Sequence, residues 1–145
     1  MDYHKPTAEE ALAAGKILHI NPEGISMLPL IKAGRDSVYI NSITFEEVKI
    51  GDIVLYRNEH HILVLHRLIK KTPTAFYTVG DNQLLSAGPY NRDALLGKMI
   101  GMERKDKYLD SRQPSMRLYG TLWMIRRRLL LIVRAAVRGK SPFEI

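Results

Sequence analysis

The sequence predicts a mainly β protein with a short N-terminal helix and a C-terminal helix. Its length of 145 residues suits a single hydrophobic core. The hydrophobic fraction of 46% and the charged fraction of 26% are typical of a globular chain. Residues 17–100 consist of short apolar or alternating runs separated by turn residues, which is the pattern of β-strands. We therefore expect a β domain with its short helix over residues 1–114, and a helix and tail over residues 115–145.

The first expected element is a short helix over residues 8–14. Thr7 and Glu10 have the spacing of a capping box, and Gly15 is suited to ending the helix. Strands are expected in six runs, at residues 16–20, 37–41, 52–57, 62–70, 76–79 and 96–102. Turn-forming sequences separate these runs, among them Asn21-Pro22-Glu23-Gly24 and Gly88-Pro89-Tyr90-Asn91. The charged residues 103–112 are expected to connect the last strand to the final helix.

The final expected element is a cationic amphipathic helix of about 20 residues. Its apolar residues recur at steps of three or four, as Leu118, Leu122, Ile125, Leu129, Ile132, Val133 and Ala136. Tyr119 and Trp123 lie where an interfacial helix carries its aromatic residues. Most of the net charge of +7 belongs to residues 115–145, which contain one acidic residue, Glu144, and seven basic ones: Arg117, Arg126, Arg127, Arg128, Arg134, Arg138 and Lys140.

Two interpretations of this helix stay open, binding to an anionic membrane surface and packing on the β domain. Nucleic acid is a less favoured partner, because the nearly neutral residues 1–114 provide no second basic surface. The arginines within residues 118–137 argue against a helix that spans a bilayer. Residues 1–14 contain no apolar run of signal-peptide length. We therefore expect a cytoplasmic protein, peripheral on the membrane if the first interpretation holds.

Two residues could carry chemistry. The sequence has no cysteine, which excludes a disulfide framework, a thiolate nucleophile and a thiolate zinc site. Ser26 is expected on a tight loop after a strand, but a serine hydroxyl is unreactive without a base. His66 lies in an apolar run, and its ordinary pKa of about 6.5 suits a base at neutral pH. Taken singly, they also fit a turn serine and a hydrogen-bonded core histidine.

No metal site is predicted. His60 and His61 are adjacent to Glu59, but neighbouring residues of a strand point to opposite faces of the sheet.

Five short motifs follow one another in a specific order along residues 24–101, and this order is more informative than any one motif alone. They are Gly24-x-Ser26-Met27-x-Pro29, Gly51-Asp52-Ile53-Val54, His66-Arg67, Gly80-Asp81-Asn82 and Gly97-Lys98-Met99-Ile100-Gly101. In this order they resemble the type I signal peptidase superfamily of serine endopeptidases, which includes the SOS-repressor autoproteases. Many members use a Ser/Lys dyad. A histidine followed by an arginine at the position of the base resembles the archaeal and endoplasmic-reticulum branch.

The resemblance implies a Ser26/His66 dyad and no metal or organic cofactor. Ser26 would be the nucleophile, His66 the general base, and the backbone N–H of Ser26 an oxyanion donor. Asp81 would either orient His66 or hold the Gly-Asp-Asn turn. The histidine-using relatives carry further acidic residues after this turn, which this sequence lacks. Asp93 could then substitute for Asp81, or His66 could have no carboxylate partner.

The resemblance also implies a peptide or protein substrate, bound as an extended strand at a sheet edge with small side chains before the cleaved bond. Ile25, Met27 and Leu28 would then lie near the substrate, although Met27 also fits the core. The expected function is a serine endopeptidase. The alternative is a non-catalytic peptide-binding or partner-docking module on the same fold, because Gly24 replaces a hydroxyl donor that is present in many bacterial relatives.

Overall fold

The computed structural model describes residues 5–139, which form two helices, a short 3-10 turn and eight strands. The prediction of a mainly β chain between two helices is confirmed. Lys140 and Glu144, counted above in the charge of the tail, lie outside the described residues. In chain order the elements are α1 (Ala8–Ala13), β1 (Leu18–Ile20), β2 (Asp36–Ser42), β3 (Ile53–Arg57), β4 (Leu63–Lys71), β5 (Ala75–Val79), β6 (Ala87–Asn91), η1 (Arg92–Ala94), β7 (Leu95–Arg104), β8 (Lys107–Asp110) and α2 (Pro114–Arg138).

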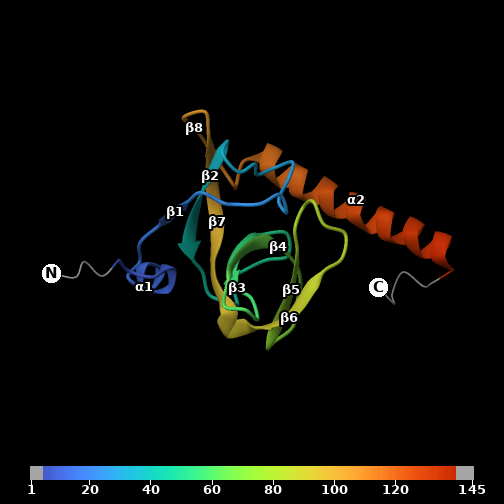
Figure 1. Cartoon of the computed structure of the whole chain (residues 1–145), viewed down its shortest axis with the longest axis horizontal. Helices are drawn as coiled ribbons and strands as arrows, with labels where there is room; N and C mark the ends of the chain where they lie inside the picture. Colours follow the sequence, from blue (N-terminus) through green and yellow to red (C-terminus); the bar gives the residue numbers. More distant parts are fainter. Residues whose placement is uncertain (1–4, 140–145) are drawn as a thin grey trace.

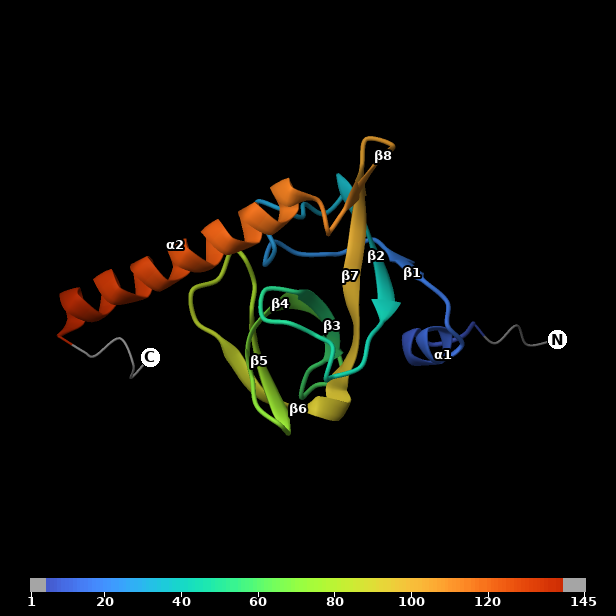
Figure 2. The ribbon, with the colours of Figure 1, turned by 180° about the vertical axis from the view of Figure 1, so that it is seen from behind.

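The strands form one antiparallel sheet in the order β1-β2-β7-β3-β4-β5-β6, and β8 pairs with β7. The long strand β7 pairs with β2, β3 and β8, and so connects the two halves of the sheet. Figures 1 and 2 show this sheet strongly curled, with α1 beside β1 and α2 running away from the opposite side. The turn after β1 and strand β4 contribute the candidate site residues described below.

Strand β3 is buried on both faces, which explains its continuous apolar sequence. Ile53 and Leu55 belong to a core cluster with Leu12 of α1 and residues of β2 and β7. Val54 and Tyr56 point into a second cluster with Phe76 and other residues. Successive side chains of a strand point to opposite faces. The side chains of residues 53–56 therefore pack alternately in the two clusters, and all four are buried.

Strands β6 and β8 are absent from the elements predicted from the sequence. The sequence predicts a turn at residues 88–91 because of Gly88 and Pro89. However, β6 is the terminal strand of the sheet and pairs only with β5 among the described residues, and an edge strand tolerates proline. Strand β8 is half of a hairpin whose turn residues, Lys105 and Asp106, have positive φ angles of 51° and 60°. Its four residues, Lys107–Asp110, have a charge at each end and no alternation of buried and exposed side chains, so no local pattern predicts a strand.

Helix α2 packs one face on the β domain. Met116 and Tyr119 contact the first core cluster, and Gly120 is buried. A Cβ atom on Gly120 would lie 2.8 Å from Nη1 of Arg67, so glycine allows the helix to approach this side chain closely. Within residues 5–139, no helix combines the length and the hydropathy needed to cross a bilayer.

Candidate active site

Ser26 and His66 are in hydrogen-bond contact. Ser26 lies in the turn after β1, and His66 lies in β4 opposite Val54 of β3. The distance from Ser26 Oγ to His66 Nε2 is 3.0 Å. This is within the range over which a histidine can take a proton from a hydroxyl. The fold therefore joins two residues that are 40 positions apart in the sequence.

The Gly80-Asp81-Asn82 turn holds the Ser26 loop. The backbone N–H of Asn82 donates to the carbonyl of Ser26 (2.9 Å), and its side-chain amide donates to the carbonyl of Ile25 (3.1 Å). A Cβ atom on Gly80 would lie 2.4 Å from the same Ser26 carbonyl oxygen, so this contact requires glycine. The turn fixes the backbone of Ser26 through a contact that no other residue type at position 80 could preserve.

Asp81 forms a buried ion pair with Arg67. Arg67 Nε donates to Asp81 Oδ1 and Nη2 donates to Oδ2, each at 2.7 Å. The side chains are 5% and 1% exposed, and Arg67 Nη1 also donates to the carbonyl of Gly51 (2.8 Å). Asp81 thus holds the Gly-Asp-Asn turn, the second of its two expected roles. Within residues 5–139, no hydrogen bond joins the Asp81 side chain to His66, so the first role, a direct bond to His66, is not observed.

Asp93 does not take that first role either. It lies exposed in η1, where its backbone N–H donates to the side chain of Asn91, and no hydrogen bond joins it to His66 within residues 5–139.

The second nitrogen of His66 lies near a tyrosine. His66 Nδ1 is 3.3 Å from Tyr56 Oη, and Tyr56 Oη is 2.7 Å from Thr78 Oγ1. The side chains of Tyr56 and Thr78 are fully buried. When Nε2 accepts the proton of Ser26, Nδ1 must carry the ring proton and donate it to Tyr56, which can donate to Thr78. A buried chain of hydroxyl groups, and not a carboxylate, therefore orients the imidazole.

Tyr56 is not among the residues predicted from the sequence, for which only carboxylates are expected as partners of the histidine. The available signal was a polar hydroxyl at the end of the buried run 53–56, since a buried tyrosine hydroxyl needs a hydrogen-bond partner.

His66 favours its neutral form. Burial lowers the pKa of His66 below its ordinary value of 6.5, and the negative charge of Asp81 opposes this shift only in part. Burial also raises the pKa of Tyr56, so its hydroxyl stays protonated at neutral pH. At pH 7 the ring is therefore a neutral base whose Nε2 can accept a proton.

We expect the ring of His66 to titrate below pH 6.5 in an NMR pH titration, with His66→Gln identifying its resonance. Because the unfolded chain takes up this proton at a higher pH than the folded one, the stability contributed by neutral His66 is complete above pH 6.5. It is lost as the pH falls through the window below 6.5, and a titration midpoint above 6.5 would contradict the burial effect.

The residues expected near a substrate differ in exposure. Ile25 is 67% exposed beside Ser26, and Leu28 is half-buried. Met27 is 5% exposed and belongs to the first core cluster, where its sulfur accepts the backbone N–H of Asp81 at 3.4 Å. Of the two roles expected for Met27, the structure has the core role, so its side chain does not face a substrate.

The first half of β4 has an open edge. Residues 63–67 pair with β3 on one side, whereas the register with β5 begins at Arg67. Within residues 5–139, the β5 side of residues 63–66 therefore has no strand partner. Ile62 and Leu63, at the start of this edge, are 57% and 38% exposed. An apolar sheet edge thus leads directly to His66.

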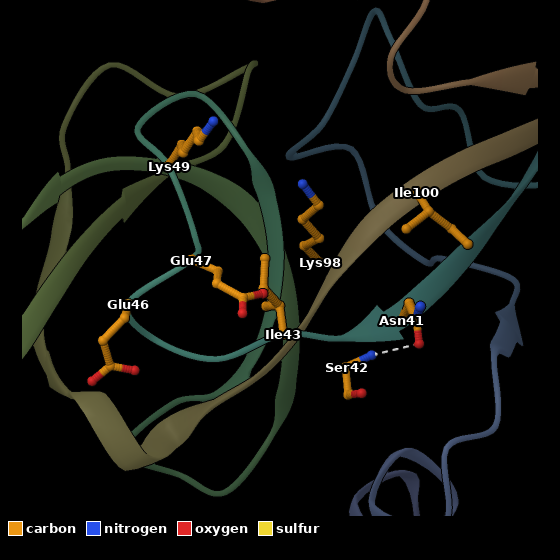
Figure 3. A pocket seen from close by; sticks show the side chains of 8 residues that line it. All are labelled: Asn41, Ser42, Ile43, Glu46, Glu47, Lys49, Lys98 and Ile100. Atoms are coloured by element: carbon orange, nitrogen blue, oxygen red, sulfur yellow. Dashed lines mark hydrogen bonds between the residues drawn. The ribbon is translucent and has the colours of Figure 1, made fainter.

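A cavity of about 540 Å³ lies at a different place in the sheet (Figure 3). It is lined by Asn41, Ser42, Ile43, Glu46, Glu47, Lys49, Lys98 and Ile100. Neither Ser26 nor His66 lines it. Among the described residues, no group of three histidine or acidic side chains gathers in a way that could hold a metal ion.

Within the described chain, the contact between Ser26 and His66 is thus the arrangement that could activate a hydroxyl group as a nucleophile. Comparison with models of known protein families finds no match for this sequence, and comparison with curated proteins finds no significant match.

Proposed function

We propose that this protein is a serine endopeptidase of the signal-peptidase type that uses a Ser26/His66 dyad. The observation that carries the proposal is the 3.0 Å contact between Ser26 Oγ and the Nε2 atom of a half-buried histidine whose pKa is lowered. A serine hydroxyl becomes a nucleophile when such a base accepts its proton. The ordered motifs of residues 24–101 support the same assignment through their resemblance to that superfamily.

In the first half of the proposed reaction, Ser26 Oγ attacks the carbonyl carbon of a peptide bond and its proton moves to His66 Nε2. The N–H of Ser26 donates to no acceptor within residues 5–139, so it is available for the oxyanion. His66 then gives the proton to the leaving amine, which leaves an acyl ester on Ser26. Water attacks this ester with His66 again as the base, which releases the acid and restores the hydroxyl.

Tyr56 is a positioning residue in this mechanism. It accepts the Nδ1 proton of His66 and so fixes the tautomer whose Nε2 faces Ser26. A neutral hydroxyl stabilises the imidazolium less than a carboxylate in direct contact would. The buried carboxylate of Asp81 contributes from a distance, since its charge raises the pKa of His66.

We expect Tyr56→Phe to lower kcat by about 10- to 100-fold with little change in KM, because it removes one hydrogen bond to the imidazolium. The reaction should also show a changed pH profile of kcat, since the pKa of His66 would shift. Tyr77→Phe on β5 is the matched control, and its kcat should equal that of the wild type. An unchanged kcat and pH profile in Tyr56→Phe would contradict the positioning role.

The proposed substrate is an extended peptide that adds as a strand along residues 63–65 of β4. Three exposed apolar side chains, Ile25, Ile62 and Leu63, lie at the open edge and beside the nucleophile. Main-chain hydrogen bonds would supply affinity along this edge, and side-chain contacts would supply selectivity. The resemblance favours small residues at the first and third positions before the cleaved bond.

The test is mass spectrometry of a peptide library that contains Ala-x-Ala segments, incubated with the wild type and with Ser26→Ala. We expect cleavage after small residues by the wild type alone. An uncut library would contradict the endopeptidase assignment.

A second candidate is a peptide-binding module without turnover, favoured by the absence of a carboxylate bonded to His66 among the described residues. Retention of library peptides on both immobilised proteins, without any product, would support it.

A further inference from the structure

We propose that α2 docks this protein in the plane of an anionic membrane through the face that points away from the β domain. This outer face consists of residues that are each 45–59% exposed: Leu118, Leu122, Ile125, Leu129, Ile132 and Val133. The whole helix extends over 25 residues, long enough to present the face as a continuous stripe.

The opposite face anchors α2 to the domain. Trp123 Nε1 donates to the carbonyl of Asp81, and Arg127 Nε donates to the carbonyl of Leu84 at 2.9 Å. With a rotation of about 100° per residue, the side chains of Trp123 and Arg127 lie on the side of the helix away from the outer face. Figures 1 and 2 show α2 projecting beyond the strands. The domain therefore cannot cover the outer face without losing these contacts.

The charge of α2 fits an anionic surface. The helix contains six arginines and no acidic residue. By the same rotation, Arg117 and Arg128 lie along one border of the outer face and Arg126 along the other, and all three are exposed. Long arginine side chains can reach lipid phosphates while neighbouring leucines enter the acyl boundary. The apolar outer face thus suits the acyl region of a lipid leaflet, and its arginine borders suit the headgroup region.

Other occupants match less of this surface. A second copy docked on the same face would bring two arginine-bordered stripes together, with no acidic residue on either α2 to pair with them. A nucleic acid could neutralise the arginines but would leave the six apolar side chains in water. An anionic bilayer can bury the apolar side chains and pair with the arginines at the same time.

Docking in this orientation would hold the Ser26 loop on the domain side of α2, about one helix diameter (~10 Å) from the bilayer. Trp123 binds Asp81, and the next residue, Asn82, binds the carbonyl of Ser26. Two successive hydrogen bonds, one from the Trp123 side chain and one between backbone groups, thus connect α2 to Ser26. Resting on the proposed function, this arrangement selects peptide segments that lie at the membrane surface as substrates.

The experiment is sedimentation of the full chain with vesicles of phosphatidylcholine alone or mixed with phosphatidylglycerol, at low and high salt. We expect binding to the mixed vesicles that weakens with salt. Leu122→Glu/Ile125→Glu should bind about 10-fold more weakly or worse, because it places two charges on the outer face. The matched control, Lys16→Gln/Lys107→Gln, changes the net charge equally at exposed positions of the β domain and should bind within about twofold of the wild type.

Several outcomes would overturn the proposal. One is equal binding by the wild type and Leu122→Glu/Ile125→Glu, and another is salt-independent binding to phosphatidylcholine alone. A third is a lipid-free dimer in light scattering that the same double variant dissociates, which would assign the face to a second copy. A salt-sensitive shift of duplex DNA without vesicle binding would assign the helix to nucleic acid. Ser26→Ala should bind vesicles like the wild type, so failure of the peptidase assignment would leave this result intact.

Discussion

Replacing Ser26 by alanine is expected to lower the rate of peptide cleavage by about 10⁴-fold or more, because the variant has no group to form the acyl ester. His66→Ala should lower the rate by about 10²- to 10⁴-fold, the usual contribution of a general base. The double variant should be no slower than Ser26→Ala, since the two side chains act as one unit. Steady-state rates on a peptide identified from the library measure all three.

Two matched variants control for unrelated effects. Ser86→Ala and His60→Ala remove the same chemical groups at exposed positions and should cleave like the wild type. Circular dichroism and the Tm of each variant establish that the fold is kept. Cleavage by Ser26→Ala or His66→Ala at the rate of the wild type would contradict the assignment of the dyad.

Breaking the ion pair between Arg67 and Asp81 is expected to destabilise the fold by about 3–5 kcal/mol. Asp81→Asn leaves the guanidinium of Arg67 buried without a balancing charge, and both side chains are nearly inaccessible to water. Urea unfolding of the purified variant measures the loss. The effect should also reach the candidate active site, because the turn that holds Asp81 holds the backbone of Ser26.

An exposed ion pair provides the control for this measurement. Arg112 is 89% exposed beside Asp110, so Arg112→Ala should cost less than about 1 kcal/mol. The double variant Arg67→Met/Asp81→Asn should be more stable than Asp81→Asn alone, because it removes the unpaired charge. A loss below about 1 kcal/mol in Asp81→Asn would mean that the buried pair contributes no more than an exposed one.

Local signals predicted α1 and most of the strands well. The capping box of α1 involves Thr7 and Glu10, three residues apart, and both of its hydrogen bonds form. Strands β3 and β4 follow from apolar runs that need burial. The edge strand β6 and the charged strand β8 could not be predicted in this way, because only their position in the sheet makes proline or charge acceptable there.

The candidate site was predictable only in part. The motif order suggested Ser26 and His66 as partners, whereas the contact between His66 and Tyr56 depends on the register of two strands. The pairing of Asp81 with Arg67 likewise depends on how the turn after β5 packs. For α2, periodicity identified the apolar stripe, but the face that contacts the domain follows from tertiary contacts such as those of Trp123 and Arg127.

A covalent acyl ester on Ser26 is the intermediate that distinguishes the proposed mechanism from a direct attack by water. The measurement is mass spectrometry of the N-terminal product released by the wild type in the presence of hydroxylamine, which captures acyl esters as hydroxamates. We predict that a hydroxamate accompanies the carboxylic acid, that its share rises with hydroxylamine, and that Ser26→Ala yields neither. Cleavage that yields only the carboxylic acid and persists in Ser26→Ala would contradict the assignment of Ser26 as the nucleophile.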